Sequence, residues 1–177
     1  MIKQFKEKIR ELKLMDKVFV IEASPEIFEF EERVLMQCFS CKRYNHSFTC
    51  PPRAPKLDYK RLISEYENCA VAYCCLPFNK KDYPEVRINS SNLLHRTLLK
   101  LEDVLRQSNY PLALSFIGGS CKLCKNGCNL VNCAAPNLAR IPLEATGINV
   151  VKSLQKIGIE VVFPVKNKIT RYGLLLW

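Results

Sequence analysis

The sequence predicts an α/β fold in which a mixed β-sheet is flanked by helices. Segments with the 3.6-residue periodicity of amphipathic helices alternate along the chain with short apolar runs of strand length. Such alternation is typical of layered α/β proteins. Short, hairpin-like links near both termini indicate that some neighbouring strands are antiparallel, which makes the sheet mixed. Because the 177 residues contain no repeat and no linker, residues 1–177 are expected to form a single domain.

The first part of the chain predicts one helix and two strands. Apolar residues recur at steps of three and four over residues 2–15, between lysines and glutamates, which is the pattern of an amphipathic helix. Residues 18–21 and 33–37 have the composition of short strands. The pair Ser24-Pro25 breaks the chain between them.

The middle of the chain predicts a helix, a strand and a long helix. Residues 57–67 have helical periodicity, and residues 70–76 form an apolar run short enough to be a buried strand, which Pro77 ends. Pro84 suits the start of a helix that ends before Pro111. One face of this helix is apolar and consists of Leu94, Leu98, Leu101 and Leu105.

The last part of the chain predicts three strands and one helix. Residues 112–117 read as a buried strand that a Gly-Gly pair ends. Residues 151–157 have a helical apolar face, and Gly158 ends that helix. Residues 160–163 and 173–176 are predicted to be the closing strands.

Cysteines follow two of these predicted strands. Cys38 comes directly after residues 33–37, and Cys121 lies four residues past residues 112–117. If the two strands run parallel, both cysteine loops lie at the same edge of the sheet, where open α/β sheets usually bind ligands. The sequence therefore predicts two Cys-rich metal loops at one sheet edge, forming one composite site or two neighbouring sites.

The distal loop, residues 121–133, contains the run Cys121-x2-Cys124-x3-Cys128-x4-Cys133. Four thiols in one short loop can enclose a single metal centre without further ligands. The loop also contains lysine and glycine residues, and cations and free backbone N–H groups favour thiolates and donate hydrogen bonds to bound sulfur. Free cysteine prefers apolar interiors, so a polar loop of this kind indicates ligation rather than packing.

The proximal loop, residues 38–50, contains Cys38-x2-Cys41-x8-Cys50-Pro51-Pro52, with His46 between the second and third cysteines. Counted with the histidine, the loop has the ligands of a tetrahedral zinc site and is one residue short of the zinc knuckles that bind single-stranded nucleic acid. Without it, three thiolates remain, and the last of them, Cys50, is followed by proline, as at the end of a bacterial ferredoxin ligand run. Three thiolates on a four-iron cluster would leave one iron open to a substrate or partner.

The cofactor is predicted to be an iron–sulfur cluster, of the 4Fe-4S type, in one or two copies, with zinc as the alternative. Both metals accept thiolates. A zinc ribbon built from the two C-x2-C pairs would leave three loop cysteines unused, whereas a four-cysteine loop and a Cys-Pro triad use all seven. The other three cysteines lie in or next to an apolar run and are predicted to be small core residues: Cys69, Cys74 and Cys75.

Composition bears on location and partners. The start of the chain alternates charged and apolar residues where a signal peptide needs an apolar run, and no stretch is apolar for long enough to cross a bilayer, so a cytoplasmic protein with no membrane contact is expected. The formal charge of +10 admits a polyanionic partner. Two filled thiolate centres would lower it to roughly +6 or +7, and basic residues are not interleaved with aromatics, so nucleic acid is disfavoured.

An ordered set of residues in and after the two loops carries a family resemblance. The set comprises Cys38, Cys41, Tyr44, Cys50-Pro51-Pro52, Gly118, Cys121, Cys124, Cys128, Cys133, Pro136, Ala139-Arg140, Pro142, Glu144-Ala145, Gly147-Ile148 and Val150. It resembles a cytoplasmic family of predicted metal-binding proteins (DUF2284) from methanogenic archaea and anaerobic bacteria. In that family the position of His46 is not a fixed histidine. The resemblance implies that the metal ligands are Cys38, Cys41, Cys50, Cys121, Cys124, Cys128 and Cys133.

Arg140 is the predicted cofactor-binding residue beyond the cysteines. It follows Cys133 in the family-like segment, and an arginine there can donate hydrogen bonds to cluster sulfur or to an anionic ligand. The alternative is a plain ion pair with Glu144, four residues on. Glu102-Asp103 and Glu31-Glu32 are expected to be solvated charges.

Three functions remain open. The first is a cysteine-ligated iron–sulfur protein that transfers electrons, delivers a cluster or assists an anaerobic enzyme, with a redox or enzyme partner protein. The second is a zinc-stabilised nucleic-acid-binding module. The third is an enzyme that acts at an open iron of the proximal loop. Nucleotide-binding and hydrolase motifs are missing, so whether the protein is an enzyme stays open.

Overall fold

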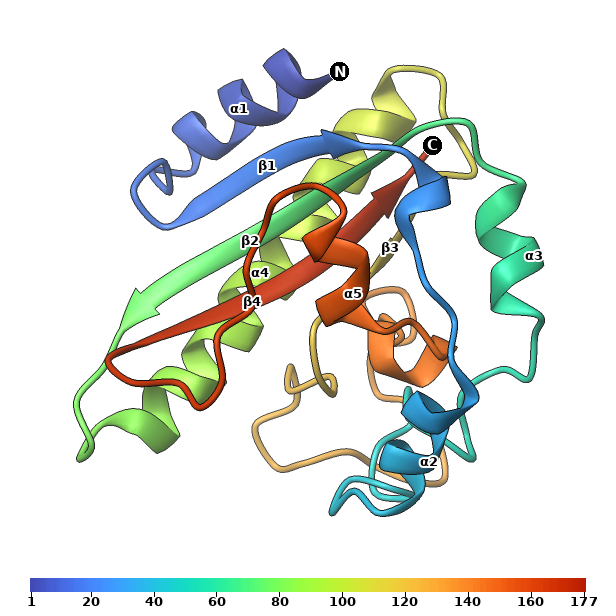
Figure 1. Cartoon of the computed structure of the whole chain (residues 1–177), viewed down its shortest axis with the longest axis vertical. Coiled ribbons are helices and arrows are strands. Elements are labelled where there is room, and N and C mark those ends of the chain that lie inside the picture. The colour runs from blue at the N-terminus through green and yellow to red at the C-terminus, as the bar shows by residue number, and fades with distance from the viewer.

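The computed structural model describes residues 1–177 and confirms the α/β class, because helices cover both faces of one four-stranded sheet (Figure 1). The strands are β1 (Val18–Ala23), β2 (Cys69–Pro77), β3 (Leu114–Phe116) and β4 (Lys168–Leu176), in the spatial order β1-β2-β4-β3. The helices are α1 (Ile2–Glu11), α2 (Glu32–Phe39), α3 (Tyr59–Ser64), α4 (Tyr83–Gln107) and α5 (Val150–Gln155), with short 3-10 turns η1 (Pro25–Ile27) and η2 (Leu143–Thr146).

The sheet is antiparallel throughout, where the sequence predicts a mixed sheet. β1 pairs with β2, β2 with β4, and β3 with β4, each pair antiparallel. β2 and β3 do point the same way, and α4 connects them as in a parallel crossover, but β4 lies between them. The only parallel pairing is an isolated bridge between Ile117 and Pro142. The expected crossover is therefore present without the expected parallel hydrogen bonding.

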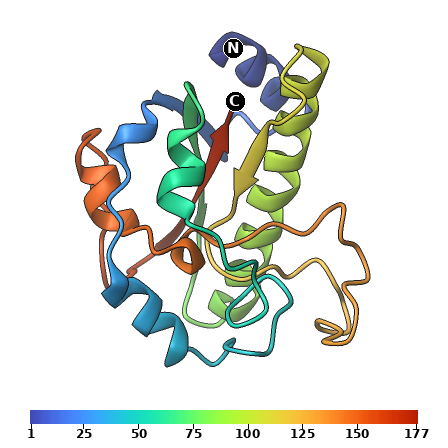
Figure 2. The same cartoon turned by 90° about the vertical axis from the view of Figure 1, so that its right-hand side faces the viewer.

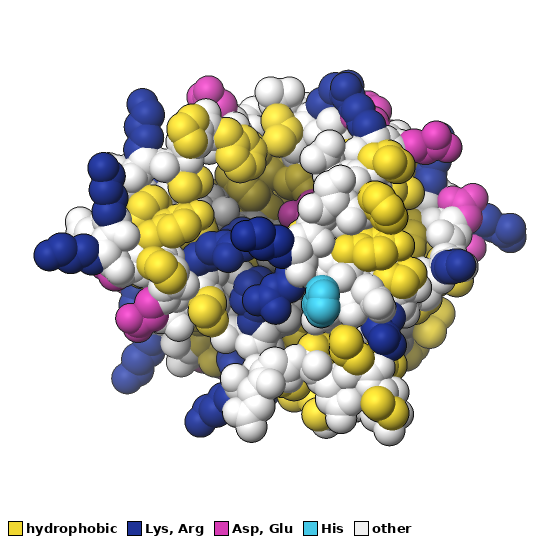
Figure 3. Space-filling model, turned by 90° about the horizontal axis from the view of Figure 1, so that it is seen from below, with side chains coloured by type: hydrophobic (Ala, Val, Ile, Leu, Met, Phe, Trp, Pro, Cys, Tyr) yellow, Lys and Arg dark blue, Asp and Glu magenta, His cyan; other side chains and the backbone are white.

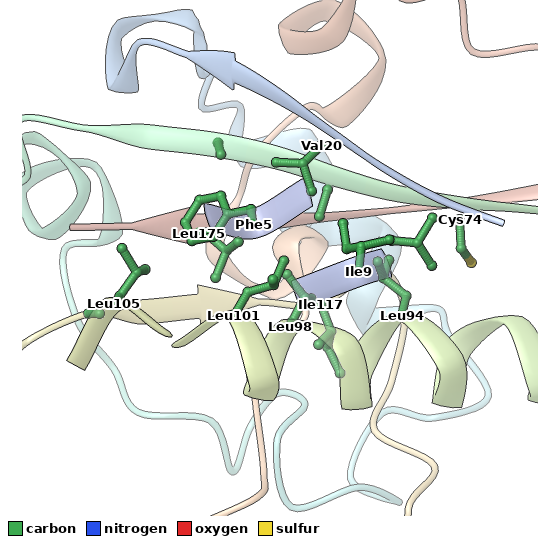
Figure 4. Packing of buried hydrophobic residues seen from close by; sticks show 14 of the residues in the cluster. Phe5, Ile9, Val20, Cys74, Leu94, Leu98, Leu101, Leu105, Ile117 and Leu175 are labelled. Atoms are coloured by element: carbon green, nitrogen blue, oxygen red, sulfur yellow. The ribbon is translucent and has the colours of Figure 1, made fainter. Parts of the chain in front are cut away.

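α1 and α4 cover one face of the sheet. The leucines predicted to line α4 are fully buried there and pack against Phe5 and Ile9 of α1 and against strand residues such as Val20 (Figure 4). Each such side chain contributes about 1.5 to 3 kcal/mol when it leaves water. This packing fixes α4 on the sheet, and the distal cysteine loop contacts α4 through Lys122 and Ser91.

α3, α5 and both 3-10 turns cover the opposite face (Figure 2). Ile63 of α3, Leu143 of η2 and Leu154 of α5 pack on Val71 and Leu174 of the two central strands. Cys69 and Cys74, which are 1% and 0% exposed, lie in the cores on opposite faces, so the prediction that they are core residues is confirmed. Cys75 is half-buried.

Two predicted strands are wrong. Residues 33–37 belong to helix α2, whose first turn contains Glu32 and which leaves Met36 and Phe39 largely exposed. An apolar run this short has no period that separates strand from helix. Residues 160–163 form no strand, because no neighbouring strand pairs with them, and Phe163 is 72% exposed. In addition, no helix is long and apolar enough to span a bilayer.

Candidate metal site

The proximal loop leaves the last turn of α2 and bends back on itself. Cys38 is half-buried, Cys41 is exposed and Cys50 is buried. The thiol of Cys38 lies 3.6 Å from the carbonyl oxygen of Glu144 and donates to it, and the backbone N–H of Arg43 donates to Sγ of Cys41 at 3.4 Å. Hydrogen bonds from backbone N–H groups to sulfur are typical of thiolate ligands.

The distal loop begins just after β3, where the chain passes close to β4. A Cβ atom on Gly118 would lie 2.4 Å from the carbonyl oxygen of Tyr172, so no larger residue fits there without moving the backbone. Within the loop Gly127 has φ +81°, a conformation that glycine adopts without strain. All four cysteines of the loop are half-buried.

The two loops contact each other. The backbone N–H of Phe48 in the proximal loop donates to Sγ of Cys128 in the distal loop at 3.2 Å, and Nη1 of Arg53 donates to the carbonyl oxygen of Leu130 at 2.7 Å. Both loops lie at the same end of the molecule (Figures 1 and 2). Their proximity was predicted from parallel strands, and that reason is wrong because Cys38 lies in α2.

The thiols within each loop are close enough to affect one another's pKa. Burial, together with the negative charges of Glu144, Cys50 and Cys41, raises the pKa of Cys38 to about 11. Burial, together with the other three distal thiols, likewise raises the pKa of Cys121. These cysteines are therefore neutral thiols at pH 7 when no cation is bound. A bound metal cation favours the thiolates, so metal binding would release protons.

The loop cysteines fit a thiophilic metal by donor type, but they are not yet in a ligating arrangement. No group of three or more Cys, His, Asp or Glu side chains is close enough together to hold a metal ion. The thiols of each loop would have to converge when a metal binds. His46, the alternative zinc ligand, is exposed on the proximal loop.

One face of α4 contacts the distal loop and the segment that follows it. We call this segment the exit of the loop. Residues 91, 95 and 102 of α4 lie on one helical face. Nζ of Lys122 donates to Oγ of Ser91 at 3.4 Å. Nε2 of His95 lies 2.8 Å from the carbonyl oxygen of Leu138, just beyond the loop.

Glu102 is the third contact on this face, and its interpretation as a solvated charge is wrong. Its side chain is fully buried and accepts hydrogen bonds from Nε and Nη2 of Arg140 at 2.6 and 2.5 Å, as well as from Ser115 and Arg106. Burial alone raises the pKa of Glu102, but the hydrogen bonds from Arg140 and Ser115 and the positive charges lower it overall. Glu102 is therefore an ionised carboxylate in the interior.

Arg140 has partners within the protein for each of its nitrogens. Nε and Nη2 donate to Glu102, and Nη1 donates to the carbonyl oxygens of Asn137 and Ala139 at 3.1 and 2.7 Å. The predicted role in cofactor binding stays a prediction, and in this arrangement Arg140 positions the distal loop. Glu144 does not pair with Arg140; its Oε2 accepts the N–H of Gly119 at 3.2 Å.

A large cavity opens beside the proximal cysteines. It has a volume of about 850 Å³, and all three proximal cysteines line it. Basic side chains gather in a hollow on this face of the molecule (Figure 3). The lining cations are Arg33, Arg43, Arg87, Lys122 and Arg171. Burial and the charges of Arg171, Arg87 and Arg43 lower the pKa of Lys122 to about 8.

The model of the family described as "Predicted metal-binding protein (DUF2284)" matches residues 22–177. The matched residues include both cysteine loops, β2, β3, β4 and the last two residues of β1. No curated protein and no solved structure matches the chain.

Proposed function

Because the chain belongs to the DUF2284 family of predicted metal-binding proteins, we propose that its seven loop cysteines hold iron–sulfur clusters in a reducing cytoplasm. The observation that carries the proposal is the contact between the two loops, in which the N–H of Phe48 donates to Sγ of Cys128. This contact brings the two cysteine loops, which are distant in the sequence, next to each other. Iron–sulfur clusters take cysteine thiolates as their usual ligands.

An iron–sulfur assignment accounts for the thiols better than zinc does. One tetrahedral zinc ion takes four ligands and would leave three loop thiols without a role. A second zinc ion on the three proximal thiols would need His46, which is exposed on the proximal loop. The four distal cysteines suit a closed centre for electron transfer. The three proximal cysteines would leave one position of a four-iron cluster open, and these are the cysteines that line the cavity. That location supports, as a second candidate, a ligand-binding or catalytic role for the proximal centre.

The proposed role is to transfer electrons, deliver a cluster or assist a larger anaerobic enzyme. Each of these needs a partner protein. The positive charge that remains after the clusters are counted favours a partner with an acidic surface.

Metal analysis after strictly anaerobic purification tests the proposal. We expect iron and acid-labile sulfide in equal amounts, with a broad visible absorption band that bleaches on reduction. Stoichiometric zinc without sulfide would overturn the iron–sulfur assignment. If such a zinc protein also bound RNA with an affinity that falls steeply with added salt, the nucleic-acid-binding alternative would replace it.

Cysteine variants test which thiols are ligands. Cys124→Ser should lose the distal centre, and Cys41→Ser should lose the proximal one. If two equal clusters are bound, each variant should retain about half of the iron of the unchanged protein. Cys75→Ser is the matched control, because Cys75 lies half-buried in β2, outside both loops, where the hydroxyl of Thr170 donates to its Sγ. Equal iron in all three variants and the unchanged protein would contradict the ligand assignment.

A further inference from the structure

We propose that the cavity beside the proximal cysteines binds a small organic anion that carries two or three negative charges and an apolar body. The proposal rests on the proposed function for one element, the neighbouring metal centre. The binding itself requires only the cavity and its cations.

Four cations converge on this cavity from four different segments. They are Arg43 of the proximal loop, Arg87 of α4, Lys122 of the distal loop and Arg171 of β4. None of the four forms an ion pair in the structure. Like charges that are brought together repel one another, so this arrangement favours a bound anion.

Arg171 is a half-buried cation in the wall of the cavity. Its Nε is buried and has no hydrogen-bond partner. A buried donor without an acceptor destabilises the folded protein. Burial and the nearby charge of Arg87 also disfavour the charged guanidinium. An anionic oxygen in the cavity would satisfy the donor and offset both charges.

The charge of the cavity sets the charge of the ligand. Glu144 is the single carboxylate on the wall, and the four unpaired cations exceed it by three. Arg33 adds nothing to this sum because it pairs with Glu31. Guanidinium groups bind carboxylate and phosphate with two parallel hydrogen bonds. A phosphate ester or a di- or tricarboxylate therefore has the matching chemistry.

The remaining walls of the cavity are apolar, so the ligand is expected to have an apolar portion. Small-molecule sites usually measure about 300 to 1,000 Å³ and combine apolar walls with a few convergent polar groups. A volume of about 850 Å³ lies in that range. The apolar lining comes from α2, α4, the α5 region and β4 and includes Val34, Tyr83, Val151, Val161, Ile169 and Tyr172.

Calorimetric titration of the full chain with three probes tests the proposal. The probes are inorganic phosphate, citrate and 1-naphthyl phosphate, and the protein is used as purified anaerobically. We expect saturable binding at one site, with 1-naphthyl phosphate or citrate bound about tenfold more tightly than inorganic phosphate. Tighter binding of the naphthyl ester identifies a phosphate ligand, and tighter binding of citrate a polycarboxylate. Absence of saturable binding of all three would overturn the proposal.

Two variants and two matched controls connect binding to the cavity. Arg171→Met and Arg87→Met should each weaken binding about tenfold. Arg87 is exposed, so its variant stays informative if Arg171→Met fails to fold. Lys168→Met on β4 and Arg96→Met on α4 remove exposed cations outside the cavity and should change affinity less than about twofold. Equal losses in variants and controls would overturn the proposal.

Metal content of the same variants separates this proposal from the previous one. If anion binding depends on Arg171 while the protein contains no iron, only the iron–sulfur function fails. If the arginine variants lose iron and the unchanged protein binds no probe, the cations are only counter-charges of the metal centre, and the anion site is overturned.

Discussion

Replacing Glu102 by alanine is expected to lower the free energy of unfolding by about 3 to 5 kcal/mol, because Arg140 then stays buried without a counter-charge. The Glu102 carboxylate is fully buried, and the Arg140 side chain is only 11% exposed. Two hydrogen bonds join them, and the hydroxyl of Ser115 donates to the same carboxylate. Removing the carboxylate leaves several buried hydrogen-bond donors without an acceptor, and each such donor lowers the stability of the folded protein.

Urea denaturation measures this difference. Asp103→Ala is the matched control, since Asp103 is the next residue on α4 and is 51% exposed, and it should change stability by less than about 0.5 kcal/mol. The double variant Glu102→Leu/Arg140→Met removes both charges and should regain much of the loss. A loss no larger in Glu102→Ala than in Asp103→Ala would show that the buried pair contributes nothing.

The Glu102 variant also tests whether α4 positions the distal loop. Arg140 follows the loop, and its Nη1 donates to the carbonyl oxygens of Asn137 and Ala139. When Arg140 loses Glu102, this exit segment loses its fixed place on α4. We therefore expect Glu102→Ala to retain less metal than Asp103→Ala at a temperature where both are folded.

Elements with a strong local pattern could be predicted from the sequence. α4 was predicted from Pro84 at its start and from the leucine face, both of which are local signals. β2 was predicted from a short apolar run, and its central place in the sheet explains why that run is nearly continuous. α2 cannot be predicted in this way, because its short apolar run has no period that separates a helix from a strand.

The candidate metal site also has parts that the sequence predicts and parts that it does not. The cysteines of each loop are close in sequence, so their grouping was visible from spacing alone. Glu102 and Arg140 are 38 residues apart, and no local pattern marks Glu102 as buried, so the sequence alone predicts a surface charge. Arg87 and Arg171 belong to a cavity assembled from four segments. Only the folded chain brings those cations together, and their sole sequence signal is the overall positive charge.

The second prediction concerns the stability of the folded protein at acid pH and depends on His95. It is 1% exposed, and burial lowers its pKa to about 4 from the ordinary 6.5, with the charge of Arg140 acting in the same direction. The carbonyl of Leu138 can only accept, so the hydrogen lies on Nε2, and Nδ1 is buried without a partner. Protonation would add a positive charge at Nδ1 with no acceptor beside it.

The direction of the pH effect follows from the lowered pKa. Between pH 6.5 and 4 the unfolded chain binds a proton at residue 95 and the folded chain does not, so stability falls as the pH falls through this range. The full contribution of about 3 kcal/mol to the free energy of unfolding is present above pH 6.5.

Denaturation curves at several pH values measure this effect. The free energy of unfolding should fall more steeply with falling pH for the unchanged protein than for His95→Gln, which cannot titrate there. His46→Gln, at the exposed loop histidine, should follow the unchanged protein. Parallel pH profiles for the unchanged protein and His95→Gln would mean that folding does not change the pKa of His95, which would contradict the lowered pKa.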